Sequence, residues 1–371
     1  MIIMGMVDRR LDQEELREIV SRVRDGTFPY EEKAAKEIDF SKYNRAQANE
    51  IADVLEMIRD VVDTAFGRLT KKETGGPGQP PKPTDDVVKV LLMQSYFGVS
   101  NRVAEGFARL FREKLGIKSD FSYKTIERGY DLERSKELLD EVFKITNEVG
   151  NPYENKFGMD GTGDPTNMKV NYESKRSQQR KEKEKNDSNE KIDAFPSAKR
   201  DFQYSVISIG LTTKIFAGFA STDNHTFGEL HHFENVFNQT LANAPEFDTF
   251  AADGLYANRV VCALLEKENI TPYLLPKSNV TFRSKGVTLW KYMLYSLVID
   301  PQKWLEGYHN RSISETGNSM LKRREPTKIR KKLSERKYTE ESLKFNIHNI
   351  RQIGYLQYLA PHFLRPEVLV S

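Results

Sequence analysis

The hydrophobic period of the chain changes at Lys156, and this change limits the possible folds more than any other feature. Before Lys156, apolar side chains recur at helical spacing. After it, short runs rich in β-branched and aromatic residues predict strands at residues 156–162, 203–211, 215–220, 248–252 and 271–275. Helices are expected between the later strands and after the last one, at 228–239, 256–267 and beyond 275. This order predicts an α/β domain with a mixed sheet flanked by helices, rather than a Rossmann repeat.

Two aspartates stand where strands are expected to end. The first strand is predicted to be short and buried, ending at Asp160 in a Gly-rich turn, and the fourth is predicted to end at Asp253-Gly254. If these two strands are neighbours in the sheet, their carboxylates converge. The commoner use of an Asp-Gly pair is a simple turn, and that alternative stays open.

A third carboxylate lies in the stretch from Tyr308 to Lys322. If this stretch is one helix, a narrow polar stripe carries one acid and three side chains that can bind phosphate: Glu315, Tyr308, Arg311 and Lys322. The opposite face is apolar and is expected to pack on a sheet: Ile313, Met320 and Leu321. Taken alone, such a stripe is more often a solvated helix surface.

The acids Asp160, Asp253 and Glu315 form a candidate metal site of oxygen ligands. Carboxylates without histidine or cysteine suit Mg²⁺ or Mn²⁺. A pair of such ions would activate an attacking water or 3′-hydroxyl and would stabilise the leaving oxygen in an in-line phosphoryl displacement. The sequence therefore predicts metal-dependent phosphoryl transfer at this site.

Three motifs of the chain resemble those of a known family. These are Met159-Asp160-Gly161-Thr162, Ala252-Asp253-Gly254-Leu255-Tyr256, and the pattern Tyr-x2-Arg-x3-Glu-x6-Lys that begins at Tyr308. Together they are similar to the motifs of the DDE transposases of the IS4/IS5-like insertion-sequence superfamily. The resemblance covers roughly residues 84–360 and includes Phe345-Asn346-Ile347-His348-Asn349, which is similar to the last helix of the family. The pattern at Tyr308 is the most specific of the three.

The resemblance implies an RNase H-like fold with Asp160, Asp253 and Glu315 as a catalytic triad that binds Mg²⁺ or Mn²⁺. It implies strand cleavage at insertion-sequence ends, followed by transfer of the 3′-hydroxyl into target DNA. The partners would be double-stranded DNA, as element ends and as target, and other copies of the chain in a homodimer or higher oligomer. Phosphates of the element end would be held by Tyr308, Arg311 and Lys322.

One departure from the family concerns the interval between Asp253 and Glu315. This interval is too short for the large β-rich insertion that some members carry there, and the extra residues lie after Asp160 instead. End processing that depends on such an insertion is therefore in doubt. Two alternatives stay open: an RNase H-like nuclease without strand transfer, and a domesticated or inactive protein that only binds DNA.

A dense basic stretch follows the Glu315 segment and is expected to extend the DNA track, with strong salt dependence. Its cationic residues are Lys322, Arg323, Arg324, Lys328, Arg330, Lys331, Lys332, Arg336 and Lys337. Trp290 and Trp304 precede this segment and could stack on an unpaired base. Packing in the core is the favoured interpretation for both.

The remaining regions follow from changes in composition. We expect a helical N-terminal region at 1–72, a Pro/Gly linker at 73–83, a helical segment at 84–150, a catalytic domain at 151–360 with a charged insertion at 172–201, and a tail at 361–371. Within 84–150, one helix should end at Gly98, a second should run from about Asn101 to Lys114, and a third should begin near Ser122. These three helices fit a helix-turn-helix DNA-binding unit or a plain helical bundle.

Composition limits the cellular setting. The 371 residues include 57 Lys and Arg against 54 Asp and Glu, so a net charge of +3 permits a nucleic-acid partner without demanding one. The single cysteine, Cys262, excludes an internal disulfide and fits a reducing compartment. No apolar run is long enough to span a membrane. We therefore expect a soluble cytoplasmic protein associated with the nucleoid.

Overall fold

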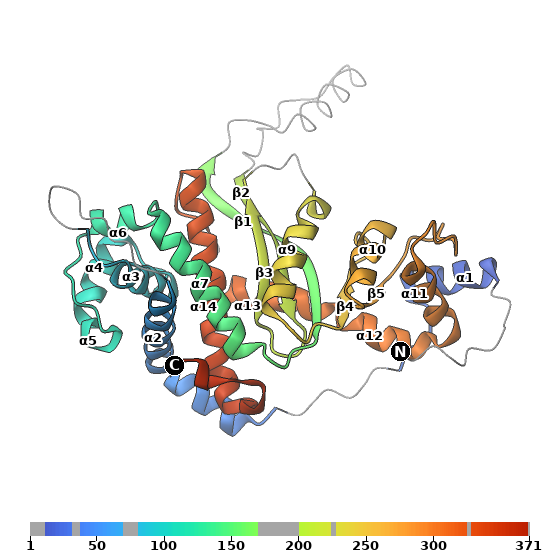
Figure 1. Cartoon of the computed structure of the whole chain (residues 1–371), viewed down its shortest axis with the longest axis horizontal. Helices are drawn as coiled ribbons and strands as arrows, with labels where there is room; N and C mark the ends of the chain where they lie inside the picture. The colour runs from blue at the N-terminus through green and yellow to red at the C-terminus, as the bar shows by residue number, and fades with distance from the viewer. Residues whose placement is uncertain are drawn as a thin grey trace, which may run out of the picture.

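The computed structural model describes residues 12–31, 38–69, 81–169, 200–223, 228–324 and 328–369. Most of the expected Pro/Gly linker, residues 73–80, and most of the charged insertion, residues 172–199, lie outside these ranges. In the described part, a helical region and a sheet-containing region lie side by side, with the long helix α14 (Ser334–Leu359) between them (Figure 1).

The centre of the molecule is a five-stranded mixed sheet in the order β3-β2-β1-β4-β5. The strands are β1 (Lys156–Lys169), β2 (Arg200–Gly210), β3 (Phe216–Thr222), β4 (Thr249–Ala252) and β5 (Thr271–Leu274). β1, β2 and β3 pair antiparallel, whereas β4 pairs parallel to both β1 and β5. The structure thus confirms the expected α/β class, the mixed sheet and the order of strands and helices. It also confirms that the first and fourth strands are neighbours.

One boundary in the sheet differs from the expectation. β1 does not end at Asp160 in a turn but continues to Lys169, because its residues keep pairing with β2 as far as the pair Lys169 and Arg200, with an irregularity after Pro165. Only the pairing with β4 stops at Met159. Asp160 therefore lies within a strand, at the point where one of its two neighbouring strands ends.

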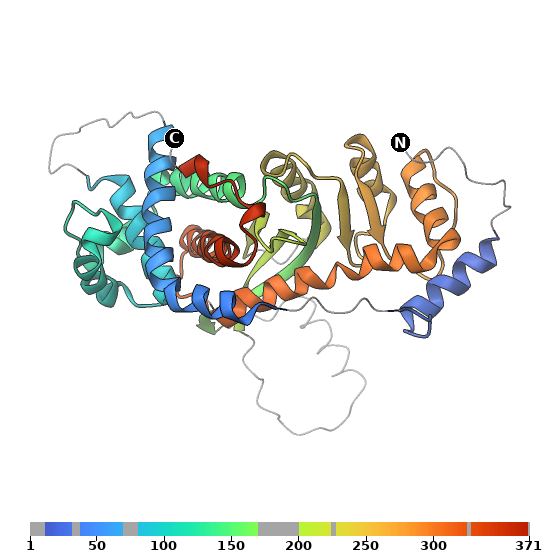
Figure 2. The same cartoon turned by 90° about the horizontal axis from the view of Figure 1, so that it is seen from below.

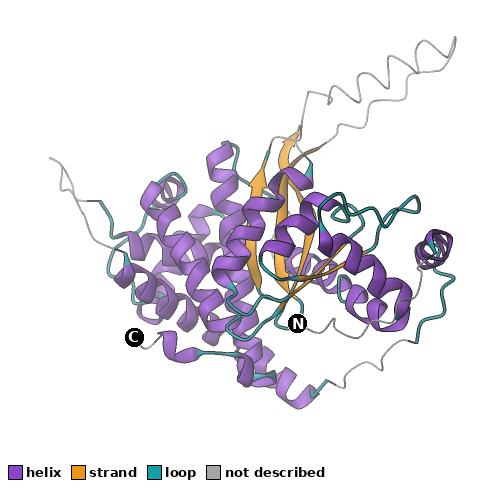
Figure 3. Ribbon diagram, turned by 45° about the vertical axis from the view of Figure 1, so that its right-hand side comes forward, coloured by secondary structure: helices purple, strands orange, loops and turns teal. Residues whose placement is uncertain are grey.

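Helices cover both faces of the sheet (Figure 3). Those of the sheet region are α9 (Glu229–Asn243), α10 (Arg259–Lys267), α11 (Thr288–Ile299), α12 (Pro301–His309) and α13 (Ser312–Arg324). Side chains alternate between faces along β2, so Val206 packs in the core with α9 whereas Ile207 and Ile209 pack with Leu321 of α13 and Phe345 of α14. This alternation places α9 on one face and the pair α13 and α14 on the other.

The helical region has its own core, to which α14 contributes apolar residues. Its other elements are α2 (Phe40–Arg68), α3 (Thr84–Phe97), α4 (Asn101–Leu110), α5 (Arg112–Leu115), α6 (Tyr123–Gly129), α7 (Glu133–Gly150), η1 (Pro361–Phe363) and η2 (Pro366–Leu369). Gly98 ends α3 in the left-handed conformation, as expected. The helix predicted at 101–114 is instead two helices, because the backbone leaves regular helical geometry at Phe111.

The two N-terminal helices pack in different places. α1 (Gln13–Arg24) lies against α11 at the sheet end of the molecule, whereas α2 packs with α3, α7 and α14 (Figure 2). The domain boundaries drawn from composition stay a prediction. No helix in the described part of the chain combines the length and apolar character needed to span a bilayer.

We predict that His348 makes folding stability depend on pH. Its Nε2 donates a hydrogen bond to Lys214 O at 2.9 Å, and burial lowers its pKa from 6.5 to about 4. Between these values the unfolded chain binds a proton that the folded chain does not, so stability falls as the pH drops from 6.5 towards 4, by up to about 3 kcal/mol. Urea unfolding of the wild type and of His348→Gln across this range measures the difference. Equal pH profiles would contradict the prediction.

Candidate active site

The sheet brings Asp160 and Asp253 to neighbouring positions. Met159 of β1 and Ala252 of β4 are the last aligned pair between these parallel strands, and each aspartate is the next residue. Asp160 Oδ1 accepts a hydrogen bond from its neighbour Gly161 N at 2.9 Å. Asp253 is exposed and caps a turn, in which Leu255 N donates to its Oδ1 at 2.7 Å. The condition for convergence, that the two strands are neighbours, is therefore met.

The stretch from Tyr308 to Lys322 is not one regular helix. α12 ends at His309 and α13 begins at Ser312, with a tight turn in which Arg311 N donates to Tyr308 O at 3.0 Å. The two helices nonetheless follow one another nearly end to end (Figure 2). Tyr308 therefore belongs to a different helix from Glu315.

The face that α13 buries also differs from the expected one. Its buried residues are Ser314, Gly317, Asn318 and Leu321, whereas Ile313 and Met320 are only partly buried. Small side chains allow α13 to approach β1 and β2 closely, because a Cβ atom on Gly317 would lie 2.2 Å from Ile209 Cδ1. This close approach brings the polar side chains of α13 towards Asp160.

One residue of α13 touches Asp160 directly. Asn318 Nδ2 donates a hydrogen bond to Asp160 Oδ2 at 2.8 Å. Glu315, one turn earlier, has a side chain that is 59% exposed and accepts a hydrogen bond from Arg311 Nη1 at 2.8 Å. Within the described ranges, no three acidic, histidine or cysteine side chains are grouped closely enough to hold a metal ion as they stand.

The electrostatics at Asp160 are unfavourable to its charge. Burial, and then the nearby carboxylates of Glu229 and Glu315, raise the pKa of Asp160 to about 6. The hydrogen bonds from Gly161 and Asn318 oppose this effect. Negative charge therefore accumulates around Asp160 without an equal amount of positive charge, which is the situation that a bound cation relieves.

Glu229, the first residue of α9, is held rigidly beside Asp160. Tyr204 Oη donates to Glu229 Oε1 at 2.6 Å, and Tyr256 Oη donates to Oε2 at 3.1 Å. Burial and the adjacent Glu229 raise the pKa of both tyrosines, so they remain donors. Both oxygens of this fourth acid are thus fixed by hydroxyl groups.

Tyr308 and the two tryptophans are mostly enclosed. The ring of Tyr308 stacks on Trp304 with centroids 5.3 Å apart, and the Arg311 guanidinium lies 5.3 Å from its centroid. Trp304 is 2% exposed and Trp290 4%, so core packing is confirmed for both. The part of Tyr308 that could meet a ligand is its hydroxyl end, where Asp253, Arg311 and Arg24 act on its pKa.

Some residues of the basic stretch after Glu315 form ion pairs within the protein, and others are exposed. Lys331 Nζ contacts Glu127 Oε2 at 2.7 Å, and Arg336 contacts both Glu127 and Asp131. Lys337 Nζ lies 3.4 Å from Asp223 Oδ2. These three cations join parts of the protein to one another. The expectation that the stretch extends a DNA track stays a prediction. Arg324 lies over the ring of Tyr355. The exposed cations of the stretch are Lys322, Arg323, Lys328, Arg330 and Lys332.

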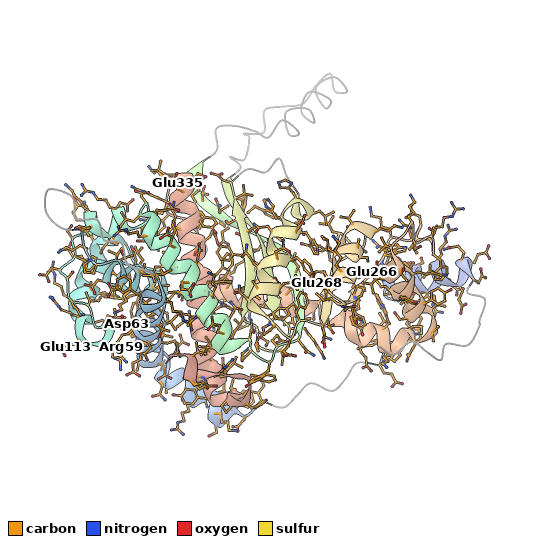
Figure 4. All side chains as sticks on the ribbon, in the orientation of Figure 1. Arg59, Asp63, Glu113, Glu266, Glu268 and Glu335 are labelled. Carbon is orange, nitrogen blue, oxygen red and sulfur yellow. The ribbon has the colours of Figure 1, made fainter. Side chains whose placement is uncertain are left out.

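Residues 328–333, which we call the strap, connect the two regions. Ile329 is fully buried and its N–H donates to Pro165 O of β1 at 2.9 Å. Glu340 accepts hydrogen bonds from the backbone N–H groups of Arg330 and Lys331 at 2.9–3.0 Å. The start of α14 continues this connection, where Glu335 Oε2 lies 3.8 Å from Lys136 Nζ of α7 (Figure 4).

Sequence reasoning missed Asn318 and Glu229. Asn318 lies three residues after Glu315 and was overlooked because the buried face of α13 consists of small and polar residues. Glu229 is an acid in the first turn of a helix, where a carboxylate usually serves to stabilise the helix N-terminus. The folded structure brings this turn close to Gly161, the residue next to Asp160, through the contact of Glu229 with Tyr204 of β2.

One known protein is similar to most of this chain. It is named as a probable transposase for an insertion sequence element of Archaeoglobus fulgidus. The two are 26% identical over 291 residues, which cover 77% of this chain and 80% of the relative. No protein-family model matches the sequence.

We predict that Arg336 and Arg323 differ in their effect on stability. Arg336→Ala removes the guanidinium that pairs with the partly buried Asp131 and leaves Glu127 with Lys331 as its remaining cation, and it should cost about 2 kcal/mol of unfolding free energy. Arg323→Ala, the same change at an exposed position of the same basic stretch, should stay within about 0.5 kcal/mol of the wild type. Chemical denaturation of both variants tests this division, and equal losses would contradict it.

Proposed function

We propose that this protein is a DNA transposase that cleaves strands at insertion-sequence ends and transfers the 3′-hydroxyl into target DNA. The observation that carries the proposal is the placement of Asp160 and Asp253 at adjacent strand positions with α13, which bears Glu315, laid across β1. The similarity to a probable transposase over most of both chains supports the same activity.

We infer that the sheet region is an RNase H-like domain of the DDE type. Three antiparallel strands followed by two parallel ones, with the first strand in the middle, support this inference. The acids then occupy a central strand, the end of its parallel neighbour and a late helix. The placement matches the order in which the three motifs occur along the sequence.

The metal ligands would be Asp160, Asp253 and Glu315. Their oxygen-only donor set fits hard cations such as Mg²⁺ or Mn²⁺. The raised pKa of Asp160 supports this assignment, because burial and nearby acids leave its charge poorly compensated. When bound, the ions would activate the attacking oxygen and stabilise the leaving one. Glu229 is a fourth carboxylate near Asp160, and the hydroxyl groups of Tyr204 and Tyr256 hold both of its oxygens.

The protein's own residues would position these groups. Asn318 fixes one oxygen of Asp160, and Arg311 holds Glu315 on the surface of α13. DNA phosphates would meet three cations of α13 and its preceding turn, namely Arg311, Lys322 and Arg323. Tyr308 would supply a hydroxyl group, and Arg324 a more distant positive charge. The active form would be a homodimer or higher oligomer on double-stranded DNA.

We predict that Glu315→Gln lowers cleavage about a hundredfold or more while DNA binding is retained, because it removes a metal ligand and leaves the phosphate contacts. The substrate is a duplex carrying the inverted repeat found beside the gene, with Mg²⁺ present. Glu268→Gln, at an exposed position after α10, is the matched control.

A titration with Mn²⁺ should also show weaker binding for Glu315→Gln than for the Glu268→Gln control. Full cleavage by Glu315→Gln would refute the assignment of the triad. If the wild type hydrolyses the duplex but does not join 3′-ends to target DNA, the result would favour an RNase H-like nuclease. If the wild type binds the duplex without hydrolysing it, the result would favour a domesticated DNA-binding protein.

We predict that Lys322→Ala weakens binding to the element end and reduces its salt dependence. Losing one phosphate contact should lower the slope of log affinity against log salt by about 0.9. The exposed Lys303→Ala on α12 gives the same change of charge outside the proposed track. Fluorescence anisotropy at several salt concentrations measures both slopes. An unchanged slope for Lys322→Ala would remove this residue from the DNA contacts.

A further inference from the structure

The N-terminal helix α1 is built into the surroundings of the candidate active site. Leu16 and Val20 are fully buried in the core that α1 shares with α11. At the end of the helix, Arg24 Nη1 donates a hydrogen bond to Pro276 O at 3.1 Å, across 252 residues of sequence. The end of α1 is thereby fixed next to the loop that follows β5.

A cavity of about 790 Å³ lies between this N-terminal segment and the edge of the sheet where Asp253 stands. Residues between Val23 and Tyr30 line one side, and the end of α12 with Arg311 lines another. Asp253 and Gly254 lie in the same cavity, which therefore opens directly onto the candidate active site.

Arg24 closely approaches the backbone beside Asp253. A Cβ atom on Gly254 would lie at an ordinary contact distance of 3.6 Å from Arg24 Nη1, but only 2.9 Å from Leu275 O, so glycine allows the backbone here to pass close to Leu275. Burial raises the pKa of Tyr308, and Arg311, Asp253 and Arg24 all act on it. The hydroxyl end of Tyr308 is thus surrounded by residues from both walls.

The lining of the cavity favours an anion. Arg24, Lys277 and Arg311 contribute three cations, whereas Asp253 is the single acid among the described lining residues. At the mouth, the rings of Tyr30 and His309 stack with centroids 4.4 Å apart. Fixed cations next to aromatic rings are the combination that binds the sugar–phosphate backbone and bases of a nucleic-acid strand.

We propose that Arg24 and Lys277 bind backbone phosphates of the DNA strand on which the site at Asp253 acts, so that the segment after α1 forms one wall of the substrate channel. This inference rests on the proposed function. It assigns to the N-terminal segment a direct contact with the strand, in addition to the contacts offered by α13.

The test compares Arg24→Gln, Lys277→Gln and the control Lys303→Gln, all of which remove one positive charge. The probe is the inverted-repeat duplex, with affinity measured by anisotropy from low to moderate salt. Each of the first two variants should bind about five- to tenfold more weakly and show a salt slope reduced by about 0.9, whereas the control should match the wild type. Arg24→Lys, which keeps the charge, should recover most of the affinity.

The outcomes separate this inference from the proposed function. If the wild type binds DNA but Arg24→Gln and Lys277→Gln match the control, the inference is overturned while the proposed function stands. If the wild type neither binds nor cleaves the duplex, the proposed function itself fails. If Arg24→Gln lowers the melting temperature by loosening α1, Lys277→Gln decides, because its side chain is exposed and does not hold the helix.

Discussion

The parallel pairing of β1 with β4 is the constraint on which the rest of the site depends. A shift of one residue in this register would turn one of the two aspartates to the opposite face of the sheet. The pairing is short, from Lys156 to Met159, and is buried among the apolar residues Phe157, Phe250 and Ala252. The core beneath this edge therefore fixes the positions of Asp160 and Asp253 in the sheet. α13 then packs on strands whose register does not depend on it.

Beyond Asp160, β1 is tied to the helical region by buried charges. Lys344 of α14 lies 2.5 Å from Asp164 and 3.7 Å from Glu341, and all three side chains are almost fully buried. Removing one member of such a group costs far more than the group contributes, because the others remain as uncompensated charges. Together with the strap, this group joins the helical region to the strand that bears Asp160.

The sequence predicted the class of the fold and placed Asp160 and Asp253 at two of its strands, because strand period and the Asp-Gly positions are local signals. It did not predict that β1 would continue beyond Asp160, since pairing with β2 decides that. The buried face of α13 was wrongly expected to be apolar: Gly317 and Asn318 pack there because the helix lies unusually close to the sheet. The sequence also did not predict the ion pairs of Arg336, because its partners Asp131 and Glu127 lie some 200 positions away in the chain.

The position of α1 has a consequence for how the chain reaches its native state. Its partners, from Pro276 to the turn at Arg311, are synthesised more than 250 residues later. Until they emerge, Leu16 and Val20 have no core to enter, and the wall that holds Arg24 does not exist. The core of the helical region also includes apolar residues of α14, so it too is completed only near the end of synthesis. A ribosome-bound intermediate would thus carry an unassembled candidate site until synthesis is nearly finished.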